Sequence, residues 1–204
     1  TYTNMLQVSR EQTNHLSIQS INVCGLKGKL RIPEFRYNLK CYDISLLSET
    51  KLDEADVELI QESISELKLK AFFKNRGIIR RYRSGGLCII FSERLEKFLT
   101  HIESKCEIVQ WLKIDKLLIG IDKDVMLGNA YIPPENSKYH NVTAFQDLQE
   151  ELIKFNNNIF CIAGDLNSHS GTVRDYVEIE DFTPEHLNFD SDSREHLNLS
   201  LIHI

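Results

Sequence analysis

Residues 159–167 read Ile-Phe-Cys-Ile-Ala-Gly-Asp-Leu-Asn, an apolar run that stops at a carboxylate. A short apolar run bounded by turn residues is typical of a buried strand. A carboxylate at the end of such a strand is costly to bury unless it is paired, hydrogen-bonded or bound to a cation. Asp165, with Asn167 beside it, is therefore a candidate for a functional site.

Three other polar residues occupy the same kind of position. Asn22 and Glu49 each end an apolar stretch, and Tyr131 lies in the last strand before Pro133. Strand ends on one rim of a sheet bring residues that are distant in sequence into one pocket. A Glu, an Asp and two Asn together form a hard, oxygen-rich site, which suits Mg²⁺.

Each of these residues also has a simpler interpretation when it is taken alone. Asn22 can be a turn or cap residue, and Glu49 can cap the helix region that follows it, through Thr50 and Asp53. Residues 165–167 can form an Asx turn, and Tyr131 can be a half-buried strand aromatic. These interpretations do not explain why all four positions recur in one chain in this order.

The remaining pattern predicts strands and helices in mixed order. Strands are expected at 16–22, 43–49, 85–91, 107–115, 117–122, 125–132 and 159–164, with a tight turn between the fourth and the fifth. Helices are expected at 33–42, 53–67 and 139–155, the last from the spacing of Val142, Phe145, Leu148, Leu152 and Phe155. Successive strands favour an α/β fold of two packed sheets with helices outside, and a doubly wound parallel sheet is the alternative.

Composition and charge set further bounds. The 204 residues suit one domain, which we place at 16–204 after a polar lead-in at 1–15. No run approaches the ~18 apolar residues of a membrane span, so no membrane partner is expected. Of the net charge of −6, residues 175–195 contribute −7 (eight acids, one arginine), which leaves +1 for the rest. The net charge therefore does not argue against a DNA partner.

The cysteines indicate the redox state of the chain. The five cysteines never have the C-x-x-C spacing, and three of them lie in or beside apolar runs: Cys88, Cys106 and Cys161. This pattern predicts reduced, buried thiols in an intracellular protein and no thiolate zinc site.

A basic segment precedes the strand at 85–91. Residues 74–83 contain no acid and carry five cations, Lys74, Arg76, Arg80, Arg81 and Arg83. The segment can be a solvated loop, or it can bind the phosphate backbone of DNA without regard to sequence.

Five motifs in order carry a resemblance to a known family: Asn22–Leu26 (NVCGL), Leu47–Thr50 (LSET), Gly85–Leu87 (GGL), Tyr131–Pro134 (YIPP) and Gly164–Asn167 (GDLN). Together they resemble the endonuclease/exonuclease/phosphatase family, of DNase I-like type, over about residues 18–204. The longer matches, including SETK at 48–51 and GDLNSHSG at 164–171, resemble the endonuclease domains of animal non-LTR retrotransposons.

The resemblance implies a four-layered α/β sandwich and Mg²⁺-dependent phosphodiester hydrolysis, with Mn²⁺ as a possible substitute. It implies that Glu49 is the main metal ligand and Asn22 a ligand or a ligand-positioning group. It implies that Asp165 orients or deprotonates the attacking water, that Asn167 holds the scissile phosphate and that Tyr131 contacts this phosphate. It also implies DNA as a partner, a reverse transcriptase domain in the parent protein, and the nucleus rather than the cytoplasm.

The chain also departs from the family pattern. The family's late Ser-Asp-His motif does not occur in the 204 residues, so we expect a domain cut short that lacks part of its second sheet. Cys24 replaces an Asp that some relatives carry. Two other functions therefore stay open: an abasic-site endonuclease or small-substrate phosphatase of the same superfamily, and a catalytically dead module that binds nucleic acid or protein.

Overall fold

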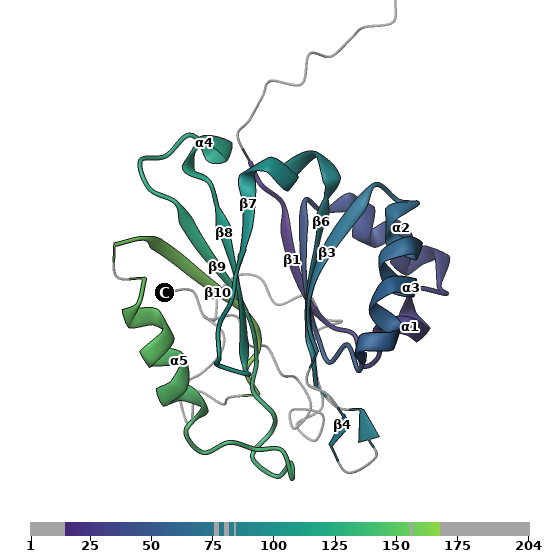
Figure 1. Cartoon of the computed structure of the whole chain (residues 1–204), viewed down its shortest axis with the longest axis vertical. Coiled ribbons are helices and arrows are strands. Elements are labelled where there is room, and N and C mark those ends of the chain that lie inside the picture. The colour runs from purple at the N-terminus through teal and green to yellow at the C-terminus, as the bar shows by residue number, and fades with distance from the viewer. Residues whose placement is uncertain (1–14, 76–77, 80–81, 84, 156, 168–204) are drawn as a thin grey trace, which may run out of the picture.

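A computed structural model describes residues 15–75, 78–79, 82–83, 85–155 and 157–167. Two four-stranded mixed sheets face each other, and helices cover the outer face of each sheet (Figure 1). The predicted four-layered α/β sandwich is confirmed. The doubly wound parallel sheet is excluded, because most strand pairs are antiparallel.

The first sheet has the strand order β1-β2-β6-β3. Its strands are β1 (Ile18–Asn22), β2 (Ile44–Ser48), β6 (Leu87–Ser92) and β3 (Leu69–Lys74). β1 and β2 are parallel, while β6 runs antiparallel to both β2 and β3. Its outer face carries α1 (Leu26–Lys29), α2 (Pro33–Cys41) and α3 (Glu54–Ser65).

The second sheet has the order β10-β9-β8-β7. Its strands are β10 (Ile159–Asp165), β9 (Val125–Tyr131), β8 (Val109–Ile114) and β7 (Leu99–Ile102). β9 and β10 are parallel, and α5 (Ala144–Ile153) covers the outer face. The connections include a 3₁₀ helix (Glu93–Phe98), α4 (Lys116–Ile119) and a small hairpin of β4 (Ile78–Ile79) and β5 (Tyr82–Arg83).

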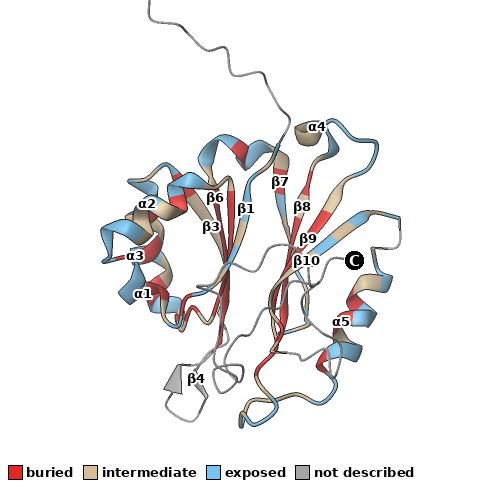
Figure 2. Cartoon of the chain, turned by 180° about the vertical axis from the view of Figure 1, so that it is seen from behind, coloured by how far each residue is buried: buried red, intermediate tan, exposed pale blue. Residues whose placement is uncertain are grey.

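The core consists of three apolar layers that follow the two-residue period of the strands. In β2, Leu47 packs toward the helices, while Ile44 and Leu46 pack against the opposite sheet. The third layer joins the second sheet to α5 around the fully buried Trp111. Figure 2 shows the buried residues on the strands and on the inner faces of the helices. No helix among the described residues is long and apolar enough to cross a membrane.

The strand predicted at 117–122 is wrong, and so is the hairpin in which it was expected to pair. Residues 116–119 form α4, because Asp115 caps it by accepting a hydrogen bond from Leu117 N and Gly120 ends it in a left-handed conformation. β8 pairs instead with β7 and β9. Strands β3 and β7 were not predicted; each lies at one end of its sheet.

Two further predictions need correction. The helix predicted at 139–155 begins only at Ala144, and two residues assigned to its apolar face, Val142 and Phe145, are exposed. Cys88 is buried as predicted, but Cys161 is exposed and Cys106 only half-buried. All five cysteines are free thiols.

A buried amide ties the two sheets together. The side chain of Asn129, fully buried in β9, donates from Nδ2 to the carbonyl oxygens of Leu47 (3.0 Å) and Cys88 (3.2 Å) in the first sheet. Leu47 and Cys88 are paired across β2 and β6. One side chain therefore fixes the second sheet against two strands of the first, close to the ends of β2 and β9.

Asn129→Asp should lower the free energy of unfolding by about 3 kcal/mol or more, since it sets a buried carboxylate against two carbonyl oxygens. Denaturant unfolding measures the loss. Gln149→Glu is the matched control, because it makes the same amide-to-acid change at an exposed position on α5 and should shift stability by less than about 0.5 kcal/mol. Equal effects of the two variants would contradict the role of Asn129.

Candidate active site

Four strand ends meet at one end of the sandwich. Asn22 is the last residue of β1, Glu49 directly follows β2, and Tyr131 and Asp165 end β9 and β10. Tyr131 and Asp165 are register partners. The sequence predicted that these residues come together on the rim of one sheet; the structure brings them together from two facing sheets.

Hydrogen bonds join these residues across the two sheets. Glu49 Oε1 accepts from Asn22 Nδ2 at 3.1 Å and from the hydroxyl of Tyr131 at 2.9 Å. Asn22 Nδ2 also donates to Asp165 Oδ2 at 2.8 Å. The amide of Asn22 therefore lies between two carboxylates from opposite sheets.

The other end of the Asn22 amide faces the backbone. Its Oδ1 accepts from the amide of Cys24 at 3.1 Å, which makes Asn22 the turn residue that the simpler interpretation expected. The turn holds the amide so that its donors face both carboxylates. The geometry favours a positioning role for Asn22 over direct metal ligation.

Asp165 and Asn167 also combine both interpretations. Asp165 Oδ1 accepts from the backbone amide of Asn167 at 3.2 Å, as in an Asx turn, while Oδ2 contacts Asn22. Asn167 Nδ2 donates to the carbonyl of Ile132 at 2.9 Å. Asn167 thus lies beside the site and ties the end of β10 to the segment that follows β9.

The contacts of Lys51 with Glu49 and Cys24 were not predicted from the sequence. Lys51 Nζ lies 3.3 Å from Glu49 Oε2 and donates to Cys24 Sγ at 3.1 Å. The only sequence signal was a lysine two positions after Glu49. In a regular strand, residues two positions apart lie on the same face, so the spacing would bring Lys51 near Glu49. Since β2 ends at Ser48, that reasoning does not apply to this pair.

The surroundings of Glu49 favour its charged form. Partial burial raises the pKa of Glu49, but hydrogen bonds from Asn22, Tyr131 and Lys51 outweigh it and hold the pKa below its usual value. The contact with Cys24, followed by that with Glu49, raises the pKa of Lys51. A carboxylate and an ammonium therefore face each other at neutral pH.

Unusual backbone conformations concentrate at this site. Of the five non-glycine residues with positive φ in the described chain, four belong to it: Cys24 (45°), Glu49 (53°), Lys51 (54°) and Asn167 (44°). Such conformations cost on the order of 1–3 kcal/mol each and persist only where the surrounding structure fixes them. Strain of this kind is typical of functional sites.

Neighbouring glycines hold the strained loop at Glu49–Lys51. Lys51 N donates to the carbonyl of Gly85 (2.9 Å) and Thr50 N to that of Gly86 (3.2 Å). On the other side, Gly25 N donates to the carbonyl of Glu49 (2.8 Å). The close approach explains Gly86, because a Cβ there would lie 2.6 Å from Thr50 Oγ1. Gly85 has a φ of 66°, which also favours glycine.

The capping interpretation is right for Asp53 and wrong for Glu49. Asp53 caps α3 and forms a capping box with Asp56. Glu49 points instead at Asn22, Tyr131 and Lys51.

The basic segment at 74–83 is described only in part. Lys74 Nζ donates to the carbonyls of Ser104, Cys106 and Val109 at 2.6–2.9 Å, which uses all three of its N–H groups. Burial lowers the pKa of Lys74. Its ammonium fastens β3 to the segment before β8 and is not available to a phosphate. Arg76, Arg80 and Arg81 and the side chain of Arg83 lie outside the described residues.

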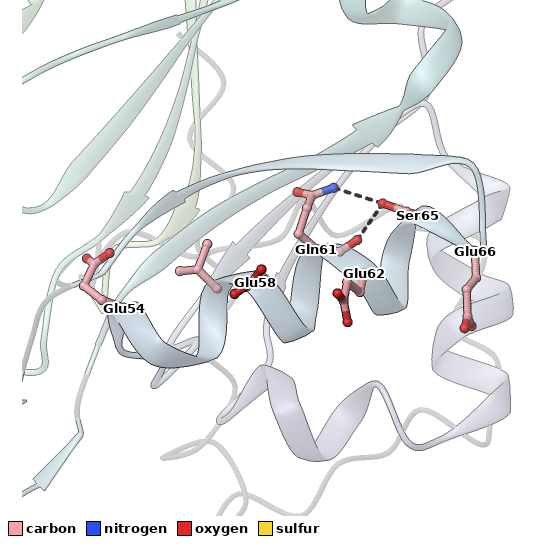
Figure 3. A pocket seen from close by; sticks show the side chains of 7 residues that line it. Glu54, Glu58, Gln61, Glu62, Ser65 and Glu66 are labelled. Carbon is pink, nitrogen blue, oxygen red and sulfur yellow. Dashed lines mark hydrogen bonds between the residues drawn. The ribbon is translucent and has the colours of Figure 1, made fainter.

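A pocket along α3 has the wrong charge for a nucleic acid. Figure 3 shows it lined by four glutamates at four-residue intervals, Glu54, Glu58, Glu62 and Glu66, together with Val57, Gln61 and Ser65. Helix α3 covers the outer face of the first sheet. A polyanion would be repelled from this face, so the strand ends are the better candidate site.

The donor set at the strand ends fits a hard divalent cation. Mg²⁺ needs only one or two protein carboxylates and completes its shell with water and substrate phosphate. Glu49 and Asp165 are such a pair, joined through one amide. Within the described ranges, no group of three or more His, Cys, Asp or Glu side chains could hold a metal ion.

The architecture is that of a known fold. The two facing mixed sheets with outer helices have the DNase I-like fold, which AP endonucleases and other members of the exonuclease-endonuclease-phosphatase superfamily share. No protein-family model and no curated protein matches the chain.

Three solved structures are similar to this chain. An AP endonuclease from Leishmania major has 18% identity and a TM-score of 0.52, covering 74% of this chain. The APE2 catalytic domain from Xenopus laevis has 17% identity and a TM-score of 0.52, and the match covers 75% of this chain. The 3′ phosphatase NExo from Neisseria has 15% identity and a TM-score of 0.51, and the match also covers 75% of this chain. The chain spans 54%, 59% and 58% of their respective lengths. At these identities the likeness establishes the fold.

Gly164 allows the approach of β10 to β9 that the site requires. It has φ = 153°, and a Cβ there would lie 1.9 Å from the carbonyl oxygen of Ala130. A side chain would push β10 away from β9 and separate Asp165 from Tyr131, its register partner.

Gly164→Ala should therefore lower the free energy of unfolding by about 2–4 kcal/mol. Denaturant unfolding monitored by Trp111 fluorescence measures it. Gly28→Ala is the control, because no atom lies within 4 Å of its added Cβ and the residue is helical. It should be neutral or stabilising by up to about 1 kcal/mol. If Gly164→Ala is as stable as the wild type, the close approach of β10 to β9 does not require a glycine at this position.

Proposed function

We propose that this chain is a divalent-cation-dependent phosphodiesterase, and specifically a DNA-nicking endonuclease of retrotransposon type. One observation carries the proposal: Asn22, Glu49, Tyr131 and Asp165, from four strands of two sheets, form one hydrogen-bonded cluster. A purely structural role would not explain why two carboxylates share one network, or why four residues around it have strained backbone conformations.

Each residue has a role in this proposal. Glu49, held by Asn22 and Tyr131, would hold Mg²⁺ or Mn²⁺, and Asn22 would also orient Asp165. A bound cation would neutralise the charge that develops on the phosphate oxygens. Asp165 would orient or deprotonate the attacking water. Tyr131 would have to turn its single O–H from Glu49 to the phosphate in order to donate a hydrogen bond there. Asn167 would have to exchange its bond to Ile132 for one to the phosphate.

The finer assignment rests on sequence motifs. The NVCGLK, SETK and GDLNSHSG segments resemble retrotransposon endonucleases more than other members of the superfamily. This assignment makes DNA the substrate, a reverse transcriptase domain the neighbour in the parent protein, and the nucleus the site of action.

An abasic-site endonuclease or a phosphatase is the second candidate. The similar structures include two AP endonucleases or their catalytic domains and one 3′ phosphatase. Nicking of a supercoiled plasmid and cleavage of a duplex with one synthetic abasic site separate the two functions. A retrotransposon-type enzyme should nick both substrates at similar rates, while a repair enzyme should require the abasic site.

Glu49→Gln should reduce Mg²⁺-dependent plasmid nicking by at least about 100-fold, because a neutral amide replaces the main anionic ligand. The change should also remove Mn²⁺ binding measured by calorimetry. Glu62→Gln on the exposed face of α3 is the matched control and should change neither. Unchanged nicking in Glu49→Gln would contradict the assignment of Glu49 as the metal ligand. DNA binding without any nicking in the wild type would favour the non-catalytic module.

The four arginines of the basic segment provide a test of DNA contact. Replacing Arg76, Arg80, Arg81 and Arg83 with Gln should flatten the plot of log binding constant against log salt by up to about 3–4 units. Lys74→Gln should leave this slope unchanged and instead lower thermal stability, because Lys74 bonds to three carbonyls. An unaltered slope in the four-arginine variant would exclude the contact.

A further inference from the structure

Lys51 is bound to the carboxylate on which the proposed function depends. Its Nζ lies 3.3 Å from Glu49 Oε2, while Oε1 already accepts hydrogen bonds from Asn22 and Tyr131. A cation that binds Glu49 must therefore approach the oxygen that Lys51 faces. An ammonium has three donors and no acceptor, so it cannot join a metal shell and can only compete with it.

The contacts of Lys51 allow it to leave Glu49. Its backbone is fixed by the bond to Gly85, but its side chain is 34% exposed on a flexible four-carbon stem. Its second partner is the thiol of Cys24, a weak acceptor, and not a second carboxylate. The ammonium therefore has one anionic partner in these contacts and a fixed pivot beside the site.

We propose that Lys51 is a tethered cation with two alternative partners. It neutralises Glu49 when no divalent cation is bound, and it binds a non-bridging phosphate oxygen of DNA when a divalent cation occupies Glu49. This inference rests on the proposed function, and it adds the residue that sets cation affinity and contacts the substrate phosphate.

Removing the charge of Lys51 should have effects of opposite sign on the two ligands. Without DNA, K51Q should bind Mn²⁺ about tenfold more tightly, the Coulomb penalty of a unit charge roughly 5 Å from a divalent ion in water. With saturating Mn²⁺, the same variant should bind DNA about fivefold more weakly and lose about one unit of salt slope. K51R, which keeps the charge, should resemble the wild type in both measurements.

The measurements need no turnover. Calorimetry gives Mn²⁺ binding to the wild type, K51Q, K51R and E49Q. Fluorescence anisotropy with a hydrolysis-resistant phosphorothioate duplex gives DNA binding at several salt concentrations. Thermal unfolding of each variant confirms that it is folded.

The outcomes separate this inference from the function on which it rests. Mn²⁺ binding that is lost in E49Q but unchanged or weaker in K51Q overturns the inference and leaves the cation site standing. Tighter Mn²⁺ binding in K51Q with unchanged DNA binding also overturns it, because Lys51 would then have no phosphate partner. Mn²⁺ binding that is the same in E49Q as in the wild type overturns both proposals.

Discussion

The shared amide of Asn22 is the contact on which the candidate site depends. Two carboxylates repel each other, and one side chain keeps Glu49 and Asp165 together by donating to both, at 3.1 and 2.8 Å. The arrangement requires a fixed distance between the sheets, because the carboxylates belong to different sheets. Asn129 and Lys74 fix that distance with five hydrogen bonds to backbone carbonyls across the sandwich. Their positions near the strand ends place this rigidity where the site needs it.

The strained loops follow from the same constraint. A regular continuation of β2 would carry Glu49 along the sheet. The left-handed conformations at Glu49 and Lys51 accompany a turn in which Glu49 contacts Tyr131 at the end of β9, and Lys51 contacts Glu49 and Cys24. Gly25, Gly85 and Gly86 hold this loop by backbone hydrogen bonds, which do not depend on the side chains of the site. The scaffold can therefore tolerate changes at Glu49 or Lys51 better than changes at the glycines that bind their backbone.

The sequence predicted the strands correctly where a run of apolar residues is buried in the core. The apolar run before Glu49 forms the buried strand β2, as predicted. The run before Asp165 forms a strand as predicted, but every residue of β10 is exposed or half-buried at the edge of its sheet, so the prediction that this strand is buried is wrong. Sequence reasoning failed where a local cap outweighs hydrophobicity, as at Asp115, which turns an apolar segment into α4. It also could not reveal the contact between Lys51 and Cys24, because that contact depends on a turn with positive φ. The half-buried state of Lys74 was hidden as well, because a lysine in a basic segment resembles a solvated one.

Charge arithmetic at the strand ends argues for a divalent cation. Glu49 and Asp165 contribute two negative charges, and Lys51 contributes one positive charge, which leaves the cluster at −1. A phosphodiester also carries one negative charge and would be repelled. One divalent cation changes the sum to +1 and makes the same cluster attractive to phosphate. A monovalent cation would only bring the sum to zero. Under the proposed function, the cation would therefore be needed to bind the substrate as well as to hydrolyse it.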